Sequence, residues 1–190
     1  MDRTDMLGLV LAGIVSFLSL PNPGVAQARP DGPDWSFAVE SEPVAYALGG
    51  AGGTVAYRTG PWTVSLEGFT LSRPESLHGN EGFEPSTSGV QMQLERYLGG
   101  GREGFYLGPE LGVSELEVTH RESGVTERRV ELSAGARFGY HWQTGLGGLY
   151  LSPVAGVSYS PASDDVTVSE ETFERTSVTP WATVGIGWTF

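Results

Sequence analysis

The chain has 190 residues, enough for one domain of ordinary size, and its hydrophobic content of 39% is too low for a bundle of membrane helices. Its 28 glycines and 12 prolines favour strands joined by many turns, and it has no cysteine for disulfides or thiolate metal sites. The net charge of −12 argues against a nucleic-acid partner, because phosphates require a basic face.

The first segment has the features of an export signal. Residues 6–20 form the only long apolar run, which is shorter than the ~20 residues that a bilayer-spanning helix needs. Two prolines follow it, and Ala-Gln-Ala at 26–28 has the small-x-small pattern that precedes signal-peptidase cleavage. We therefore expect residues 1–28 to be a cleaved signal peptide, with an uncleaved anchor as the alternative, and residues 29–190 to form one mature domain.

After a lead-in rich in proline, glycine and aspartate, apolar residues alternate with polar or small ones in a series of segments. A period of two is the pattern of a β-strand that has two different environments. The first two strands are short, and residues 43–53 between them are ambiguous. The alternation predicts about eight strands, near residues 35–40, 55–57, 62–67, 90–95, 105–114, 129–142, 149–160 and 177–190.

The connections between these strands alternate between short and long. The short turns lie near 58–61, 99–104 and 143–148, and the long polar connections near 72–88, 117–128 and 161–175. Barrels of bacterial outer membranes pair short periplasmic turns with longer external loops. The rhythm of the connections therefore favours a membrane barrel over a soluble barrel or sandwich, which remains the alternative.

The two faces of the strands differ in a way that also favours a membrane. Aromatic residues lie close to the short turns or the matching chain end, as in a membrane-interface belt: Trp35, Tyr57, Trp62, Tyr97, Phe105, Tyr140, Trp142, Tyr150, Trp188 and Phe190. Charged residues lie on the face opposite the apolar one: Glu67, Glu95, Glu110, Arg129, Glu131 and Arg137. We assign this second face to the lumen, where glycines would make space for a packed Glu/Arg network.

The last strand, Ser177 to Phe190, carries the clearest resemblance. It alternates strictly and ends on an apolar-face phenylalanine, which is similar to the last strand of bacterial outer-membrane β-barrels. Together with the hairpin rhythm and the aromatic belt, it makes residues 35–190 resemble the small eight-stranded barrels of the OmpA-domain, OmpX and OmpW type. No functional motif of that family carries over.

The resemblance implies an all-β fold, a closed antiparallel up-and-down transmembrane barrel in the outer membrane of a Gram-negative bacterium. It implies contact with outer-membrane lipids and lipopolysaccharide, and recognition of the strand that ends in Phe190 by the outer-membrane insertion machinery. We expect a monomer. Three prolines inside the strands, Pro109, Pro153 and Pro180, each remove a ladder hydrogen bond, and we expect local bulges there.

Three groups of residues could carry chemistry, and each has a plainer interpretation. His78 with Glu81 and Glu84 lacks firm metal-ligand spacing, so an exposed loop is the preferred interpretation. His141 lies on the lumenal face, the same face as Arg137, and near the periplasmic end, where it cannot pair with a nucleophile at the outer rim.

The third group is the acidic connection at 161–175. It could hold divalent cations, but it lacks the spacing of a calcium loop, and a solvated external loop is the preferred interpretation. Its five carboxylates are Asp164, Asp165, Glu170, Glu171 and Glu174.

We assign no catalytic, cofactor-binding or metal-binding residue and expect no cofactor. The sequence predicts a non-enzymatic outer-membrane protein with a structural or surface-recognition role carried by its external loops. One alternative is a narrow barrel that transports small hydrophobic molecules, which the charged lumen disfavours. A second is a lipid-modifying enzyme, which the absence of a nucleophile–base pair disfavours.

Overall fold

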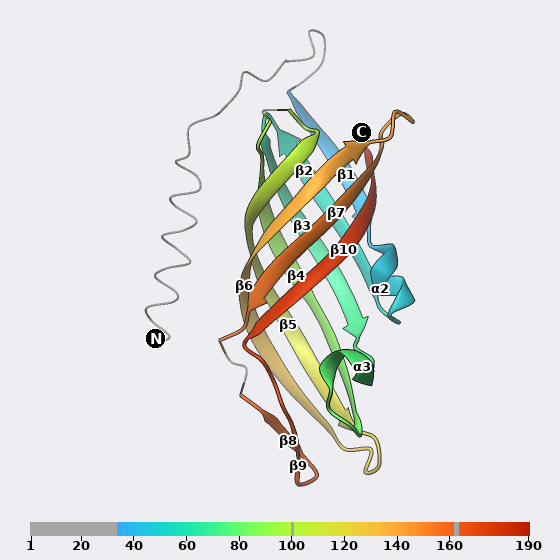
Figure 1. The fold of residues 1–190 in the computed structure, drawn as a ribbon, viewed down its shortest axis with the longest axis vertical. Coiled ribbons are helices and arrows are strands. Elements are labelled where there is room, and N and C mark those ends of the chain that lie inside the picture. Colours follow the sequence, from blue (N-terminus) through green and yellow to red (C-terminus); the bar gives the residue numbers. More distant parts are fainter. Residues whose placement is uncertain (1–33, 100, 162–163) are drawn as a thin grey trace.

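Eight antiparallel strands close into a barrel in the computed structural model, which describes residues 34–99, 101–161 and 164–190. Each strand pairs with its neighbours in the chain, and the first pairs with the last, so the predicted up-and-down barrel is confirmed (Figure 1). The barrel strands are β1 (Trp35–Ser41), β2 (Ala51–Thr59), β3 (Trp62–Ser72), β4 (Phe83–Tyr97), β5 (Gly104–His120), β6 (Thr126–Gln143), β7 (Leu149–Tyr159) and β10 (Val178–Thr189). The predicted signal peptide, residues 1–28, lies outside the described residues.

Four small elements lie in the long connections. They are the helices α2 (Pro43–Ala47) and α3 (Glu75–His78) and the strands β8 (Val166–Val168) and β9 (Glu171–Phe173). The ambiguous segment between the first two strands thus contains a helix, which begins at a proline as first helical turns often do. None of the described helices has the length and apolar character needed to cross a bilayer.

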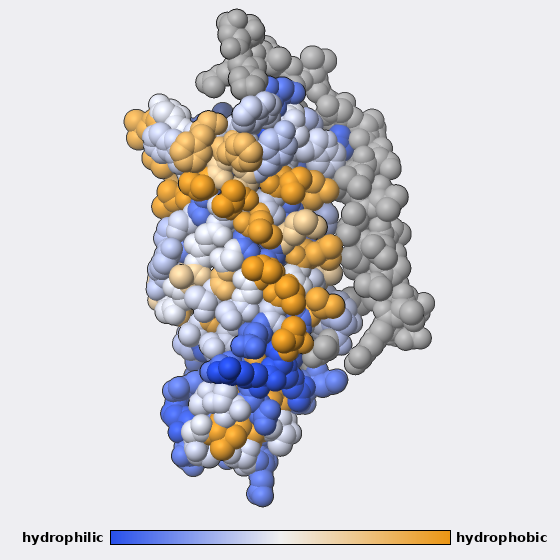
Figure 2. All heavy atoms as spheres, turned by 180° about the vertical axis from the view of Figure 1, so that it is seen from behind, coloured by the Kyte–Doolittle hydropathy of each residue, from blue (hydrophilic) through white to orange (hydrophobic). Residues whose placement is uncertain are grey.

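The barrel is apolar outside and polar inside. Outward side chains such as Val55 and Leu66 are each 59% exposed, whereas Glu67, Glu95 and Arg137 are buried in the lumen. Hydrophobic side chains gather around the upper part of the barrel, and hydrophilic ones lie below them (Figure 2). An apolar surface of this extent would drive aggregation in water but suits the hydrocarbon of a bilayer. The strands therefore form a transmembrane barrel.

The two ends of the barrel differ as the connections predicted. At the upper end in Figure 1, turns of a few residues join β2 to β3, β4 to β5 and β6 to β7, and the C-terminus lies there too. At the lower end, β4, β5 and β6 extend beyond the other strands, accompanied by α3, β8 and β9. By analogy with membrane barrels, we call the upper end periplasmic and the lower end extracellular.

The long connections are shorter than the sequence predicted, because the strands continue into them. In these extensions the apolar side chains lie on the inward face instead of the outward one. On β5, Leu111 and Val113 face outward and are exposed, whereas Leu116 and Val118 farther along face inward and are buried. Glu115, on the outward face, marks the change from apolar to polar. The residues predicted as loops at 72–88 and 117–128 therefore include strand residues of β4, β5 and β6. The outward apolar face ends where the strands leave the membrane.

The strand prolines produce no bulge, so that expectation is wrong. Pairing of β4 with β5 keeps one register on both sides of Pro109, since Gln93 pairs with Glu110 and Arg96 with Leu107. The pairing of β6 with β7 likewise keeps its register across Pro153. A missing N–H interrupts the ladder locally without shifting it.

Pro180 lies on an open edge of the barrel wall. β1 and β10 pair over only four positions, from Ala38–Thr189 to Ser41–Ile186. The Phe190 amide donates to the Phe37 carbonyl at 2.8 Å, so alternate, even-numbered residues of β10 direct their backbone groups toward β1. Pro180 belongs to this set but lies beyond the end of the pairing. It therefore removes no ladder bond, as expected of an edge-strand proline.

Candidate functional site

The periplasmic third of the lumen is centred on Arg58. Its guanidinium lies 3.4 and 3.5 Å from the two ring nitrogens of His141 and donates to the Thr189 hydroxyl at 2.9 Å. It also lies 4.4 Å from the centre of the Tyr150 ring, within cation–π range. The prediction that His141 faces the lumen near this end is confirmed, but its cationic neighbour is Arg58 rather than Arg137.

The middle of the lumen contains a buried ion pair. The Arg137 Nε atom lies 3.3 Å from the Glu95 carboxylate, and both side chains are almost fully buried. Next to this pair, the Tyr106 and Ser152 hydroxyls share a hydrogen bond of 2.9 Å. This arrangement confirms that Glu95 and Arg137 belong to a Glu/Arg network inside the barrel.

Two further lumenal carboxylates, Glu67 and Glu110, bond to neutral groups. Glu67 accepts from the Gln93 amide, which in turn accepts from the Ser65 hydroxyl at 2.7 Å. Glu110 accepts from Ser158 at 2.6 Å and from the Trp181 indole at 3.2 Å. Because these groups bond to one another across the barrel, the lumen is a packed polar core rather than an open channel.

Glycines on the wall provide the space for the large lumenal side chains. A Cβ atom at Gly187 would overlap the Tyr150 ring, and one at Gly139 would overlap the Tyr106 ring. A Cβ atom at Gly156 would lie 2.5 Å from the Trp181 ring. Any of these contacts is too short for real atoms, so alanine does not fit at these positions. The predicted role of glycine in the lumen is confirmed.

Two tyrosines predicted in the aromatic belt lie in the lumen instead. Tyr97 and Tyr150 are each 1% exposed, and both rings contact His141. The parity of their strands could have shown this, because Tyr150 alternates with Leu149 and Leu151, which lie on the apolar face. Six other predicted belt residues are at least 40% exposed: Trp35, Tyr57, Phe105, Trp142, Trp188 and Phe190.

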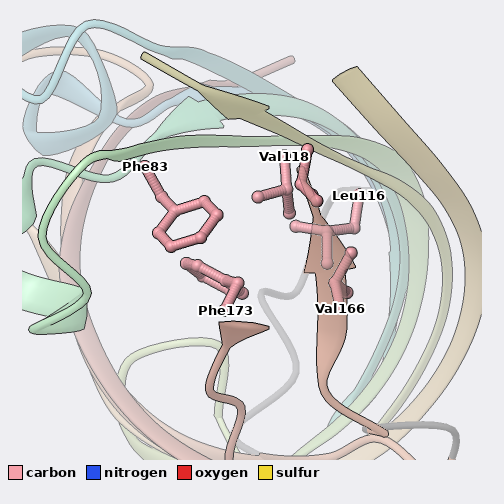
Figure 3. Close-up of a cluster of buried hydrophobic side chains, with 6 residues drawn as sticks. Phe83, Leu116, Val118, Val166 and Phe173 are labelled. Atoms are coloured by element: carbon pink, nitrogen blue, oxygen red, sulfur yellow. The ribbon is translucent and has the colours of Figure 1, made fainter. Parts of the chain in front are cut away.

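The extracellular end is closed by a small second core, which we call the cap core. It consists of buried side chains from β4, β5, β8 and β9: Phe83, Leu116, Val118, Val166, Val168 and Phe173. Figure 3 shows these side chains gathered inside the ring of barrel strands. The hairpin of β8 and β9, together with α3 and the strand ends around it, forms the cap. The described residues of the acidic connection, 164–175, thus contain a folded hairpin, and all five of its carboxylates are exposed, as the preferred interpretation of a solvated external loop predicted.

Polar contacts join the β5–β6 connection and the β8–β9 hairpin to each other and to the barrel wall. Arg175 forms an ion pair with Glu131 of β6, with one Nη2–Oε2 distance of 2.7 Å. His120 lies 3.3 Å from the Glu171 carboxylate, and the Ser123 and Ser169 hydroxyls are 2.7 Å apart. These contacts connect segments that lie far apart in the sequence, so the cap depends on the tertiary packing of the barrel.

His78 lies at the edge of the cap core, with its ring 5.6 Å from that of Phe173. Its Nδ1 atom accepts a hydrogen bond from the Asn80 amide at 3.1 Å. Burial, with smaller contributions from Arg73 and Arg121, holds its pKa below the usual value, and Glu75 opposes this shift. In the described part of the chain, no group of three or more His, Cys, Asp or Glu residues could hold a metal ion.

Most sequence-predicted lumenal charges lie where they were expected, and one does not. Glu67, Glu95, Glu110 and Glu131 are buried, whereas Arg129 is exposed at the extracellular end and donates to the Asp164 carbonyl at 3.3 Å. Sequence reasoning missed the residues of the cap. The alternation of Val166 and Val168, followed by Phe173, was the signal that a hairpin lies within the acidic stretch.

Known structures share this architecture. Neisserial surface protein A matches with a TM-score of 0.56 at 10% sequence identity, over 84% of this chain and 100% of that chain. The fold is that of the small outer-membrane barrels. Two further matches are the N-terminal β-barrel domain of Pseudomonas aeruginosa OprF and a major outer membrane protein from Thermus thermophilus.

The OprF domain matches with a TM-score of 0.46 at 13% identity, over 84% of this chain and 100% of that chain. The Thermus protein matches with a TM-score of 0.42 at 15% identity, over 82% and 99% of the two chains. No family model and no curated protein matches the chain. At these identities the similarity is one of fold.

Proposed function

We propose that the protein is a non-enzymatic barrel of the bacterial outer membrane whose extracellular cap recognises partners at the cell surface. The observation that carries this proposal is the cap itself. An external loop that only joins two strands needs no hydrophobic core, whereas this one packs six buried side chains against the barrel mouth. A rigid surface of this kind pre-organises its exposed groups for binding. The packed lumen leaves the cap as the part of the molecule best suited to recognition.

The role of the cap can be tested by deleting the β8–β9 hairpin, because the two residues that flank it, Ser160 and Ser177, are hydrogen-bonded to each other. The Ser160 amide donates to the Ser177 carbonyl at 2.9 Å, so an Asn-Gly turn can replace residues 161–176 without moving β7 or β10. We expect this shortened barrel to keep heat-modifiable migration in unboiled gels. Cells that express it should attach less to protein-coated surfaces than cells with the intact barrel. Equal attachment would contradict the recognition role.

Export and membrane insertion belong to the same proposal. Residues 1–28 are proposed to act as a cleaved signal peptide, and the strand that ends in Phe190 as the signal for the insertion machinery. The barrel would then contact lipopolysaccharide and other outer-membrane lipids as a monomer. Recovery of the mature chain in the outer-membrane fraction would support this, and a soluble periplasmic product would contradict it.

The orientation of the barrel can be tested separately. If the cap faces the medium, an impermeant maleimide should label Thr172→Cys in intact cells. The label would be specific, because the chain has no cysteine of its own.

Transport of small hydrophobic molecules is a second candidate, and one observation favours it. Among the described strands, none pairs with β10 on the β1 side from Val178 to Gly185, and α2 contacts β10. A lateral opening here would connect the lumen to the bilayer. The polar, filled lumen opposes this function. Liposomes containing the barrel should take up an apolar dye no faster than protein-free liposomes, and faster uptake would favour transport.

A lipid-modifying activity has less support. His141 is the one histidine in the membrane-spanning lumen of the described barrel, and its ring contacts Arg58, Gln143 and Tyr150 rather than a serine or threonine hydroxyl. A general base needs a nucleophile within hydrogen-bonding reach. We therefore propose no catalytic role for it.

A further inference from the structure

In the β8–β9 hairpin of the cap, β9 has an edge that no other strand pairs with among the described residues. Two residues, Ser169 and Glu170, connect β8 to β9 with positive φ angles of 53° and 72°, so the hairpin has a tight type I′ turn. Val166 pairs with Phe173 and Val168 with Glu171. Backbone groups on a strand alternate in direction, so those of the residue between, Thr172, point away from β8.

Asn80 contacts the same edge of the chain, two residues beyond Thr172. Its side-chain amide binds Glu174 twice, donating to the Glu174 carbonyl at 3.1 Å and accepting from the Glu174 amide at 2.8 Å. These are the two hydrogen bonds that a residue on a neighbouring strand would make. Since Glu174 and Thr172 are two residues apart, their backbone groups point to the same side. Asn80 therefore occupies one position of the edge, and the position at Thr172 is the next one along.

The position at Thr172 is unoccupied by protein. Among the described residues, neither its N–H nor its C=O has a hydrogen-bond partner outside the hairpin. In front of it is a groove of about 470 Å³, in the size range of small ligand sites. The groove is lined by Gly79, Asn80, Glu81, Phe83, Glu171, Thr172 and Glu174. Phe83 and Phe173 pack edge to face beneath it, so its floor belongs to the cap core.

The groove is negatively charged, which favours a positively charged partner. Three of its lining residues are glutamates and none is basic. Glu171 lies near His120, whereas Glu81 and Glu174 form no ion pair with any residue that the structure describes. A free strand edge binds an extended peptide through main-chain hydrogen bonds, and the surrounding side chains select its sequence. Carboxylates on both sides of the groove select arginine or lysine.

We infer that the edge of β9 at Thr172 is a docking site for an extended, basic segment of another protein, which adds to the β8–β9 hairpin as a third strand. This inference rests on the proposed role of the cap in recognition and names the partner's chemistry. Asn80 limits the added strand to a short segment, so a single site binds weakly. Many copies on one cell surface would raise the overall attachment through multivalency. A second copy of the chain is a poor partner, because it would bring like charges together.

The test uses the folded mature barrel and a blocked seven-residue peptide, acetyl-(Arg-Thr)3-Arg-amide. Two further peptides carry N-methyl groups on all arginines or on all threonines, which removes the donors of one edge and preserves every charge. We expect the parent peptide to bind and at least one methylated peptide to bind at least tenfold more weakly. Equal binding of all three would overturn the inference, since attraction to a negative protein would then explain it.

A pair of matched variants separates the groove from the general charge of the cap. Glu81→Gln with Glu174→Gln removes two charges from the groove, and Glu115→Gln with Glu127→Gln removes two from exposed positions outside it. The first pair should weaken peptide binding at least tenfold, and the second should change it less than twofold. Equal effects, or concentration-dependent self-association without peptide binding, would overturn the inference.

The two proposals fail in different ways. If no peptide binds but the shortened barrel still reduces cell attachment, the docking site is wrong and the recognition role survives. If the peptide binds as expected but attachment is unchanged by shortening, the site exists and the recognition role is wrong.

Discussion

Arg175 and Glu131 form the ion pair that joins the extracellular hairpin to the barrel wall. Both side chains are at most 10% exposed, although Arg175 belongs to a connection outside the membrane. The pair lies where the polar lumen meets the apolar cap core. It therefore links the two packed regions of the molecule.

Loss of this ion pair should open the cap. In Arg175→Ala the buried Glu131 carboxylate loses its cation, which typically costs about 3 kcal/mol for a pair of this burial. Opening of the hairpin lets water reach Glu131, so we expect faster hydrogen exchange in residues 164–176 and little change in the barrel strands. The matched control is Arg128→Ala, which removes an exposed pair with Glu117 at 2.8 Å and should cost under about 1 kcal/mol. Equal exchange in both variants would contradict the role of the buried pair.

The packing of glycines against lumenal rings predicts a sharp difference between two alanine substitutions. Gly187→Ala would place a methyl group against the Tyr150 ring, and overpacking of this kind typically costs about 1–3 kcal/mol. Gly68→Ala, on the same barrel, meets no atom within 4 Å and should be neutral or slightly stabilising. Urea unfolding of the two variants in detergent micelles measures the difference. A neutral Gly187→Ala would mean that Tyr150 can leave its position at no cost.

The open edge of β10 makes adjacent positions respond differently to proline. At Ala182 the backbone N–H points toward the unpaired side, so Ala182→Pro should lower the free energy of unfolding by less than about 1 kcal/mol. At Thr183 the N–H points toward β7, with which this residue is paired, so Thr183→Pro removes a ladder bond. We expect the second variant to refold poorly in the heat-modifiability assay. Similar losses for both would mean that β1 or α2 pairs with this edge in the membrane.

His78 should make the cap sensitive to acid. Its pKa in the folded protein lies below the ordinary 6.5, chiefly because the ring is partly buried, so the neutral ring favours the folded cap. The stabilisation is complete above 6.5 and is lost as the pH falls through the lowered value. Hydrogen exchange of residues 164–176, corrected for its intrinsic pH dependence, should therefore accelerate as the pH falls from 6.5 through the lowered pKa of His78. His78→Asn keeps an acceptor for the Asn80 amide and should reduce this acceleration, and an unchanged pH profile would exclude His78 as the cause.

The sequence by itself determined the barrel. Strict alternation fixes which face of each strand is apolar, and this is a local property of consecutive residues. The rhythm of turns and the distribution of charges followed from the same local pattern. The orientation of Glu95 and Arg137 into the lumen could therefore be predicted before any contact was known. Even the inward direction of Tyr97 and Tyr150 was available from parity, and only their proximity to the turns suggested otherwise.

The tertiary structure decided which side chains meet. Arg58 binds His141, 83 residues later, and Thr189, 131 residues later, and nothing near Arg58 in the sequence specifies either partner. The same holds for Asn80 and Glu174, whose contact aligns the open edge at Thr172. These contacts depend on the register in which the strands close and on the packing of the cap against the barrel wall. Local patterns determine the face to which a residue belongs, but closure of the barrel determines its neighbours.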